Sequence, residues 1–362
     1  MKNIPYLLAL HSVNGLGPIR LKKLLDYFQS DPRLVWEADL KEIKGLGIPE
    51  ITVIQFGETR KKLDPDKYLE SVEKAGLKWM TIFDEDYPKL LKTIYDPPLV
   101  FYYIGEILPS DSKAIAVVGT RKITGYGKLV TEDFTKGLVS AGLTIVSGLA
   151  IGVDTIAHQT AIDNHGRTIA ILGGGLNSIF PPENTRLVLE IADGKGAVIS
   201  EFPPDYPSVA GNFPARNRVI SGLSVATLVT EAAEDSGSLI TARLALEQGR
   251  DVFAVPGPVT SALSKGPISL IKEGARVVME YGEILEELGL DRVKSLESRV
   301  KEEQALSDQE KKILECLENE NKHIDEICRE LSINAALVSG TLLKLEILGL
   351  VRSLGGGQYS VS

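Results

Sequence analysis

Cysteine, histidine and long apolar runs are all scarce in this chain of 362 residues. Its two cysteines, Cys316 and Cys328, are too few for a disulfide framework, which fits a reducing cytoplasm. Its four histidines are scattered and lack the spacing of metal ligands. No apolar run reaches the ~20 residues of a membrane-spanning helix, and the start lacks an A-x-A-like cleavage site. We therefore expect a cytoplasmic protein with no membrane association, signal peptide or metal site.

Basic side chains are also fewer than acidic ones, and the net charge is −9. The excess acid is concentrated at the end of the chain. Residues 276–362 carry 11 basic and 17 acidic side chains, a net charge of −6, whereas residues 113–275 carry 14 and 15, a net charge of −1. A basic groove in the centre is therefore compatible with the overall charge. It would have to be built from few arginines and many backbone N–H groups.

The centre of the chain alternates short β-branched runs with amphipathic stretches such as Lys128–Ser140 and Leu239–Gln248. This alternation predicts an α/β fold with a doubly wound parallel sheet, an extended Rossmann-like domain over residues 113–290. Such sheets bind ligands at the carboxyl ends of their strands, near a topological switch point. Strands are expected at Ile115–Val118, Thr144–Val146, Thr168–Leu172, Ala197–Ser200, Ala226–Thr230, Val252–Val255 and Arg276–Met279.

Helical patterns dominate residues 1–70, where two Gly-x-Gly turns, Gly15–Gly17 and Gly45–Gly47, separate helical stretches. These turns resemble a helix-hairpin-helix (SAM-like) module, in which glycines let backbone N–H groups approach a DNA phosphate. A helical module without a ligand is the alternative. Residues 71–112 predict a connector that packs on the central domain, with extended segments Lys78–Phe83 and Leu99–Ile104.

The charged residues 291–306 predict a linker, and residues 307–362 predict a winged-helix module. Ser307 and Glu310 have the spacing of a capping box. Helices are expected at Ile324–Leu331 and Ala335–Leu348, followed by a β-hairpin wing around Gly355–Gly357. A helix that reads duplex DNA normally presents a basic face, but Ala335–Leu348 offers only Lys344. We therefore expect this module to contact a further protein partner; the alternative is that only one end of it touches DNA.

Five strands of the central domain end in small or glycine-rich turns. Because parallel strands end at one edge of the sheet, these turns should lie together. Glycines there allow close backbone approach, and helix starts supply N–H donors for a phosphate. The candidate binding residues in these turns are Gly119, Thr120 and Arg121, then Gly148, then Gly173, Gly174, Asn177 and Asn184, and finally Ser236, Gly237 and Ser238.

The segment Phe213–Gly222 carries the strongest single signal. Pro214 and Gly222 predict the start and stop of a helix, which places Arg216 and Arg218 in its first turn. The helix dipole disfavours cations there, so two arginines beside Asn217 indicate a bound anion, most simply a phosphate. The alternative is that both arginines pair with acidic side chains elsewhere.

Four aromatic residues are expected at the same edge: Phe180, Phe202, Tyr206 and Phe213. Aromatic faces among phosphate-binding turns suit single-stranded nucleic acid, whose bases stack on rings. We expect at least two of the four rings to cap the core, and Phe213 or Phe180 to contact a base.

The familiar nucleotide-binding motifs are absent. The P-loop spacing is missing, Leu129 replaces the Ser or Thr that would hold magnesium, and Val130 stands where the dinucleotide fingerprint needs glycine. No nucleophile elbow or Ser/His/Asp set is present either. We therefore expect no cofactor and no catalytic residue.

Taken in order, these turns, together with Phe253–Gly257 and Leu270–Ala275, closely resemble the DNA-processing protein A (DprA, or Smf) family. The resemblance implies single-stranded DNA binding, protection of incoming strands, loading of RecA recombinase during natural transformation, and a homodimer formed through the Rossmann-like domain. It places the strand at Thr120, Arg121, the Gly173–Asn184 turn and Arg216 to Arg218. A lysine often expected on the strand-binding face is not obvious, although Lys122 follows Arg121.

The alternative is a phosphoribohydrolase-like enzyme that acts on nucleoside monophosphates, with Glu231 as its acid. Such enzymes use a Pro-Gly-Gly-x-Gly-Thr helix start, whereas this chain has Asp235–Ser238.

Overall fold

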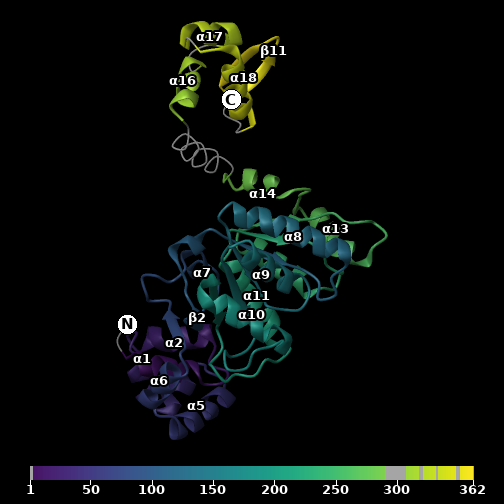
Figure 1. Cartoon of the computed structure of the whole chain (residues 1–362). Helices are drawn as coiled ribbons and strands as arrows, with labels where there is room; N and C mark the ends of the chain where they lie inside the picture. Colours follow the sequence, from purple (N-terminus) through teal and green to yellow (C-terminus); the bar gives the residue numbers. More distant parts are fainter. Residues whose placement is uncertain (1–2, 291–306, 318–320, 332, 348–350, 362) are drawn as a thin grey trace. The chain divides into compact units, whose positions relative to one another are not determined.

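The computed structural model describes residues 3–290, 307–317, 321–331, 333–347 and 351–361. It divides into two units, Met1–Ile284 and Leu285–Ser362, each of which is described by itself (Figure 1). The expected linker, residues 291–306, lies outside the described residues. No helix in the described ranges is long and apolar enough to cross a membrane.

A nine-stranded sheet forms the centre of the first unit, in the order β1-β2-β6-β5-β4-β3-β7-β8-β9. Strands β3 to β9 run parallel, as predicted, whereas β1 and β2 are antiparallel and extend the sheet beyond β6. The expected connector therefore contributes two strands to the sheet itself. The strands are β1 Lys78–Thr81, β2 Val100–Gly105, β3 Ala114–Val118, β4 Thr144–Ser147, β5 Thr168–Leu172, β6 Gly196–Ser200, β7 Ala226–Val229, β8 Asp251–Ala254 and β9 Arg276–Val277.

Helices cover both faces of the parallel part of the sheet, which is why its strands are continuous apolar runs. On one face, Ala116 and Ile171 pack against Val219 of α11 and Leu239 of α12. On the other face, α9 contacts β3, β4 and β5 and packs beside α8. The helices of this domain are α7 Lys89–Lys92, α8 Gly125–Ser140, α9 Val153–Asp163, α10 Thr185–Glu190, α11 Asn212–Gly222, α12 Gly237–Glu247, α13 Lys265–Lys272 and α14 Tyr281–Glu287.

The switch point of the sheet lies between β3 and β7. The chain forms β3, β4, β5 and β6 in one direction and then returns to place β7 beside β3. The carboxyl ends of β3 and β7 therefore flank a crevice of the kind in which doubly wound sheets bind ligands. Residues 119–121 and 231–238, which are far apart in the sequence, both leave the sheet there.

Six short helices form the N-terminal module, and the two glycine turns connect α1 to α2 and α4 to α5. Gly15 and Gly47 adopt φ angles of +82° and +78°, which favour glycine. Leu7 and Leu10 of α1 share a core with Tyr102 of β2, so this module packs against the extended end of the sheet (Figure 1). The helices are α1 Ile4–His11, α2 Pro18–Tyr27, α3 Pro32–Glu37, α4 Leu40–Gly45, α5 Glu50–Lys62 and α6 Pro65–Lys74.

The second unit contains the predicted winged helix. The capping box is confirmed, because the Ser307 N–H donates to Glu310 Oε2 at 2.7 Å and the Glu310 N–H donates to Ser307 Oγ at 3.4 Å. Ile327, Val338 and Leu342 lie in its small core. Its elements are α16 Asp308–Leu317, β10 Lys322–His323, α17 Ile324–Leu331, α18 Ala335–Ile347, β11 Val351–Gly355 and β12 Gln358–Val361; the predicted end of α18, residue 348, lies outside the described residues.

Candidate nucleic-acid interface

A cavity of about 430 Å³ occupies the crevice between the ends of β3 and β7, and we call it the switch-point pocket. Its walls come from residues 118–122 after β3, Ala150 and Asp154 after β4, the 213–220 segment of α11, and the 233–241 segment at the start of α12. It brings together nine predicted site residues: Gly119, Thr120, Arg121, Phe213, Arg216, Asn217, Ser236, Gly237 and Ser238. The other seven, Gly148, Gly173, Gly174, Asn177, Phe180, Asn184 and Arg218, do not line it.

Two exposed cations, Arg121 and Lys122, enter this pocket from a fixed backbone. The preceding residue, Thr120, is 7% exposed, and its N–H donates to the carbonyl of Glu231 at 2.7 Å. Its hydroxyl accepts the N–H of Lys122 at 3.1 Å. The loop that carries both cations is therefore tied to the end of β7, and Lys122 lies beside Arg121 in the pocket wall.

The ring of Phe213 lies among two cations and a second ring. The guanidinium carbons of Arg121 and Arg216 lie 5.4 and 6.0 Å from its centre, within cation–π range. The ring of Phe180, which is 47% exposed, lies 5.9 Å away. Gly173 packs directly beneath, since a Cβ there would lie 2.7 Å from Phe213 Cδ1. Phe213 is only half-buried, so it offers a ring face beside positive charge.

Arg216 forms the buried floor of the pocket. It is 5% exposed and donates to the carbonyls of Gly148, at 2.6 Å, and Ile171. Burial lowers the pKa of Arg216 to about 10 and raises the pKa of neighbouring Asp154, which accepts the N–H of Gly148 at 3.1 Å. Arg216 therefore keeps its charge at neutral pH while it joins the ends of β4 and β5 to α11.

Asp154 is a pocket residue that the sequence analysis did not single out. An acidic residue in the first turn of a helix is usually explained by the helix dipole alone. Here the carboxylate of Asp154 also orders the β4–α9 turn, because it accepts a second N–H, that of Ala150, at 3.3 Å. No local sequence signal separates these two roles.

The start of α12 forms the opposite side of the pocket. The hydroxyl of Ser236 caps the helix by accepting the N–H of Ser238, and the two serine hydroxyls lie 2.8 Å apart. Asn217 of α11 donates to the carbonyl of Gly237 at 3.2 Å, which joins the two helices. The first-turn N–H groups of a helix have no intrahelical acceptors, and the helix dipole favours an anion there.

Glu231 is structural in this fold. It is 3% exposed, and both of its carboxylate oxygens accept hydrogen bonds from Thr124, one from the N–H at 2.9 Å and one from the hydroxyl at 2.7 Å. Thr124 in turn caps α8 through the N–H of Gly127. Glu231 therefore holds the loop between β3 and α8 in place.

The turn from Gly173 to Asn184 lies behind the pocket. Gly174 packs against Ser208, and exposed Asn177 donates to Asp205 at 2.7 Å. Asn184 is buried and donates to the carbonyl of Leu149 at 2.8 Å. The glycines of this turn thus have a packing reason within the chain, and its contact with a strand stays a prediction.

The predicted start of α11 was wrong. The helix begins at Asn212, so Arg216 and Arg218 are its fifth and seventh residues and lie beyond the first turn. The N–H groups of a helix's first turn lack intrahelical acceptors, so proline, which has no N–H, fits at any position of that turn. Pro214 therefore indicated that a helix begins nearby but not at which residue.

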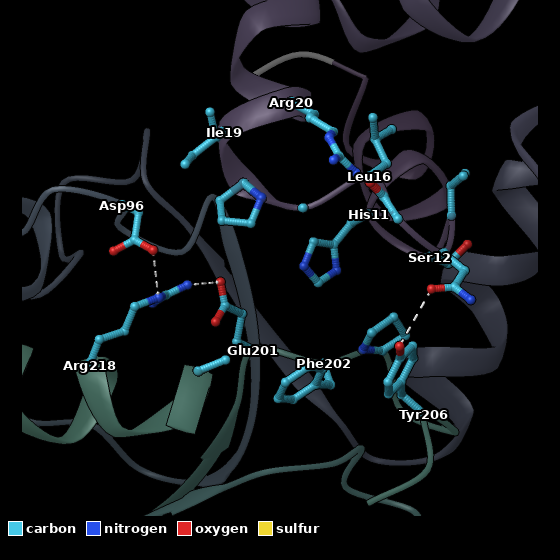
Figure 2. Close-up of a pocket in the computed structure, with 17 residues that line it drawn as sticks. His11, Ser12, Leu16, Ile19, Arg20, Asp96, Glu201, Phe202, Tyr206 and Arg218 are labelled. Carbon is cyan, nitrogen blue, oxygen red and sulfur yellow. Dashed lines mark hydrogen bonds and ion pairs between the residues drawn. The ribbon is translucent and has the colours of Figure 1, made fainter. Parts of the chain in front are cut away.

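Arg218 faces away from the switch-point pocket. It lines a second cavity, where its side chain is 10% exposed and pairs with Asp96, at 3.0 Å, and with Glu201 (Figure 2). The alternative considered from the sequence, that the arginines pair with acidic side chains, therefore holds for Arg218. A contact between Arg218 and a strand stays a prediction that this geometry does not favour.

The expectation that at least two of the four rings cap the core is not met. Phe202 and Tyr206 stack on each other, with ring centres 5.3 Å apart, and both line the second cavity. Phe213 lines the switch-point pocket, and the ring of Phe180 lies 5.9 Å from the Phe213 ring. None of the four is buried among the core residues of the described structure.

Within the described residues, no group of three or more His, Cys, Asp or Glu side chains is arranged to hold a metal ion. The site combines two exposed cations, one buried cation, ring faces and a helix start with the carboxyl groups of Asp154 and Asp235, and its cationic side can hold a phosphate next to a flat ring.

Comparison with known proteins identifies the family of the chain. The family model for DNA recombination-mediator protein A matches residues 78–289, and that for the DprA winged helix domain matches residues 297–357. Protein Smf of Synechocystis is 37% identical over 98% of both chains.

Two solved structures are similar as well. DNA processing protein A of Streptococcus pneumoniae is 37% identical, with a TM-score of 0.69, and the match covers 79% of this chain and 99% of that one. DNA processing protein A of Helicobacter pylori, studied for its single-stranded DNA binding mode, is 31% identical, with a TM-score of 0.53, and the match covers 59% of this chain and 97% of that one. The chain therefore belongs to the DNA recombination-mediator protein A family.

Proposed function

We propose that this protein is a non-enzymatic recombination mediator that binds single-stranded DNA in the switch-point pocket. The observation that carries the proposal is the position of Arg121, an exposed cation 5.4 Å above the half-exposed ring of Phe213. A strand needs cations for its phosphates and ring faces for its unstacked bases, and this pocket offers both. The similarity to the Helicobacter pylori protein supports the same assignment.

The phosphates of the strand would lie along Arg121, Lys122 and the start of α12, where the N–H groups and the Ser236 hydroxyl form the wall. Arg216 beneath them adds positive potential without contacting solvent. The base next to this phosphate would stack on Phe213, with Phe180 extending the ring surface. Backbone contacts and stacking carry little base specificity, which suits a protein that handles strands of any sequence.

The alternative, hydrolysis of nucleoside monophosphates, is less favoured by the geometry. Its acid would have to be Glu231, whose two carboxylate oxygens already accept hydrogen bonds from Thr124. A general acid must reach the leaving group within hydrogen-bond distance, and Glu231 is 3% exposed.

The partners are part of the proposal. Family membership supports loading of RecA recombinase onto bound strands, with protection of incoming DNA during natural transformation. A homodimer through the Rossmann-like domain is supported by the edge strand β9, in which Val277 is 50% exposed and after which Met279 is 72% exposed. Both cysteines are free thiols, which supports action in the reducing cytoplasm.

The exposed side chains of the winged helix favour a protein partner over duplex DNA. Lys344, the single cation of α18, pairs with Glu310 at 2.5 Å. Leu337 and Leu343, on the same helix, are 44% and 59% exposed. A helix that reads a DNA groove presents cations, whereas this one presents apolar side chains.

The test is binding of labelled single-stranded and duplex DNA over a salt series, with an assay for base release from AMP alongside. Preference for the single strand, affinity that falls steeply with salt, and no base release are expected. Absence of single-strand binding at low salt would refute the proposal, and base release that depends on Glu231 would favour the enzyme.

A further inference from the structure

A second cavity, of about 660 Å³, lies between the first helical hairpin and the edge of the sheet (Figure 2). We call it the hairpin pocket. One wall is residues 11–20, which comprise the end of α1, the glycine turn and the start of α2. The facing wall comes from the 201–206 segment, Asp96, and Ala215 and Arg218 of α11. The function proposed above makes no use of this pocket.

Three unsaturated rings, those of Phe202, Tyr206 and His11, line the pocket. Phe202 and Tyr206 stack with their planes 25° apart, and both are half-exposed. The Tyr206 hydroxyl reaches Asn14 of the hairpin at 3.5 Å, and the His11 ring points toward them from the opposite wall (Figure 2). Burial lowers the pKa of His11 to about 4, so its ring is neutral at neutral pH. Such a slot suits a flat, uncharged ring.

Donors for an anion lie at the other end of the pocket. Helix α2 begins after Gly17 without a side-chain cap, so its first-turn N–H groups have no side-chain acceptor. Arg20, in the same turn, donates to the carbonyl of Gly15 at 2.7 Å and is held beside this helix start. A cation and the positive end of a helix in one place favour a phosphate.

Two polar atoms in the pocket wall are shielded from water and have no hydrogen-bond partner among the described residues. They are Nη1 of Arg218, whose side chain is nine-tenths buried, and Nδ1 of His11. Buried polar atoms in native proteins almost always have partners. One such atom lies behind each of the two facing walls, so unsatisfied hydrogen-bonding groups border the pocket on both sides.

Helix α11 separates the two pockets. Ala215 and Arg218 line the hairpin pocket, whereas Phe213, Arg216 and Asn217 line the switch-point pocket. A helix with its side chains is only ~10–12 Å across, and its first turn, at Ala215, is exposed. A strand that leaves one pocket can thus reach the other by crossing this turn.

We propose that the hairpin pocket binds a nucleotide unit, with its base on Phe202 and Tyr206 and its phosphate at the start of α2 beside Arg20. For a bound strand this is a second contact, beyond the switch-point pocket, and it rests on the single-strand binding proposed above. A free nucleoside monophosphate presents the same ring and phosphate, so the experiment separates the two sources.

The test uses the full chain and two pairs of variants. Arg20→Ala removes the exposed cation at the start of α2, and Lys22→Ala removes an exposed cation of the same helix that does not line the pocket. Ala215→Glu places a carboxylate at the mouth of the pocket, and Ala210→Glu makes the same change at an exposed position outside it. Arg20→Lys keeps the charge, and melting temperatures confirm that each variant is folded.

Binding is measured with strands of about 16 nucleotides, within the usual range of single-strand sites. Arg20→Ala and Ala215→Glu should weaken binding about tenfold relative to their controls, as expected for a lost stacked base or phosphate contact. Arg20→Lys should recover most of the affinity. Strands carrying 5-iododeoxyuridine should cross-link to the peptide that contains Phe202 and Tyr206.

A parallel titration with dAMP, followed by NMR, identifies the source. Shifts at the hairpin pocket without any effect of the variants on strand binding would assign the pocket to a free nucleotide. Variants that bind strands like their controls, no cross-link and no dAMP shift would overturn the inference. If Arg121→Ala weakens strand binding in that case, the proposed function stands; if no variant has an effect on binding, the proposed function fails too.

Discussion

Replacing Arg121 with alanine tests the switch-point pocket most directly. Its side chain is exposed and forms no ion pair within the described residues, and its guanidinium lies over the Phe213 ring. Its removal should weaken single-strand binding and leave the fold intact. Arg216, the other arginine that lines the pocket, cannot separate these effects, because it is buried and holds other elements in place.

The magnitude follows from what Arg121 can contribute. A hydrogen bond between charged groups is worth about 1.5–3 kcal/mol, so Kd for a single strand should rise roughly 10- to 150-fold. One phosphate contact fewer should reduce the slope of log K against log salt by about 0.7. The free energy of unfolding should change by less than about 0.5 kcal/mol, as for other exposed substitutions.

The assay is fluorescence anisotropy with a labelled oligonucleotide at several salt concentrations, together with urea unfolding. Arg186→Ala is the matched control, since Arg186 is 90% exposed, pairs with Glu190 on its own helix and does not line the pocket. Arg121→Lys should keep the salt slope but bind less tightly, because an ammonium group cannot stack on Phe213 as a planar guanidinium does. If Arg121→Ala keeps both the affinity and the slope of the control, the strand does not lie in this pocket.

Three further predictions concern buried groups. Arg218→Met should lower the free energy of unfolding by about 3 kcal/mol, because it leaves the carboxylate of Glu201, whose side chain is 11% exposed, without its cation, and a second change, Glu201→Gln, should recover part of the loss in urea unfolding. Glu231→Gln should destabilise the fold by roughly 1–3 kcal/mol through the lost charged contacts to Thr124, with AMP hydrolysis absent before and after, as followed by chromatography. Burial lowers the pKa of His158 to about 3. Below about pH 6.5 the unfolded chain therefore binds a proton at this residue, whereas the folded chain does not, so the free energy of unfolding decreases as the pH falls. Between pH 7.5 and pH 5 the wild type should lose about 2 kcal/mol more than His158→Gln, and equal losses in urea unfolding would contradict this.

The fold was largely predictable because its signals are local. Alternating apolar runs predicted the parallel strands, and the run Thr168–Leu172 matches β5 at both ends. The spacing of Ser307 and Glu310 predicted a capping box within a single helical turn. The glycines at positions 15 and 47 predicted tight hairpins, because few other residues adopt the required φ angles.

The site was only partly predictable because its geometry depends on residues far apart in the sequence. Arg121 and Ser236 share a pocket as predicted, since the switch point brings the ends of β3 and β7 together. Arg218 was grouped with Arg216, but residues two apart on a helix face in different directions, and the partners of Arg218 come from other elements. The second cavity depends on packing between the hairpin and the 201–206 segment, which no local pattern encodes.

The buried position of Arg216 has a consequence for how the protein would hold DNA in the presence of salt. Dissolved ions screen charges that water surrounds, but they screen a charge enclosed by protein far less. Arg121 and Lys122 would therefore supply the part of the attraction that salt removes, whereas the field of Arg216, which is fixed by the carbonyls of Gly148 and Ile171 and partly offset by Asp154, would be screened far less. The positive field at the rim of the pocket would thus depend strongly on salt, and the field at its floor would depend on salt much less. A residual affinity should therefore remain at salt concentrations that abolish simple ion pairing.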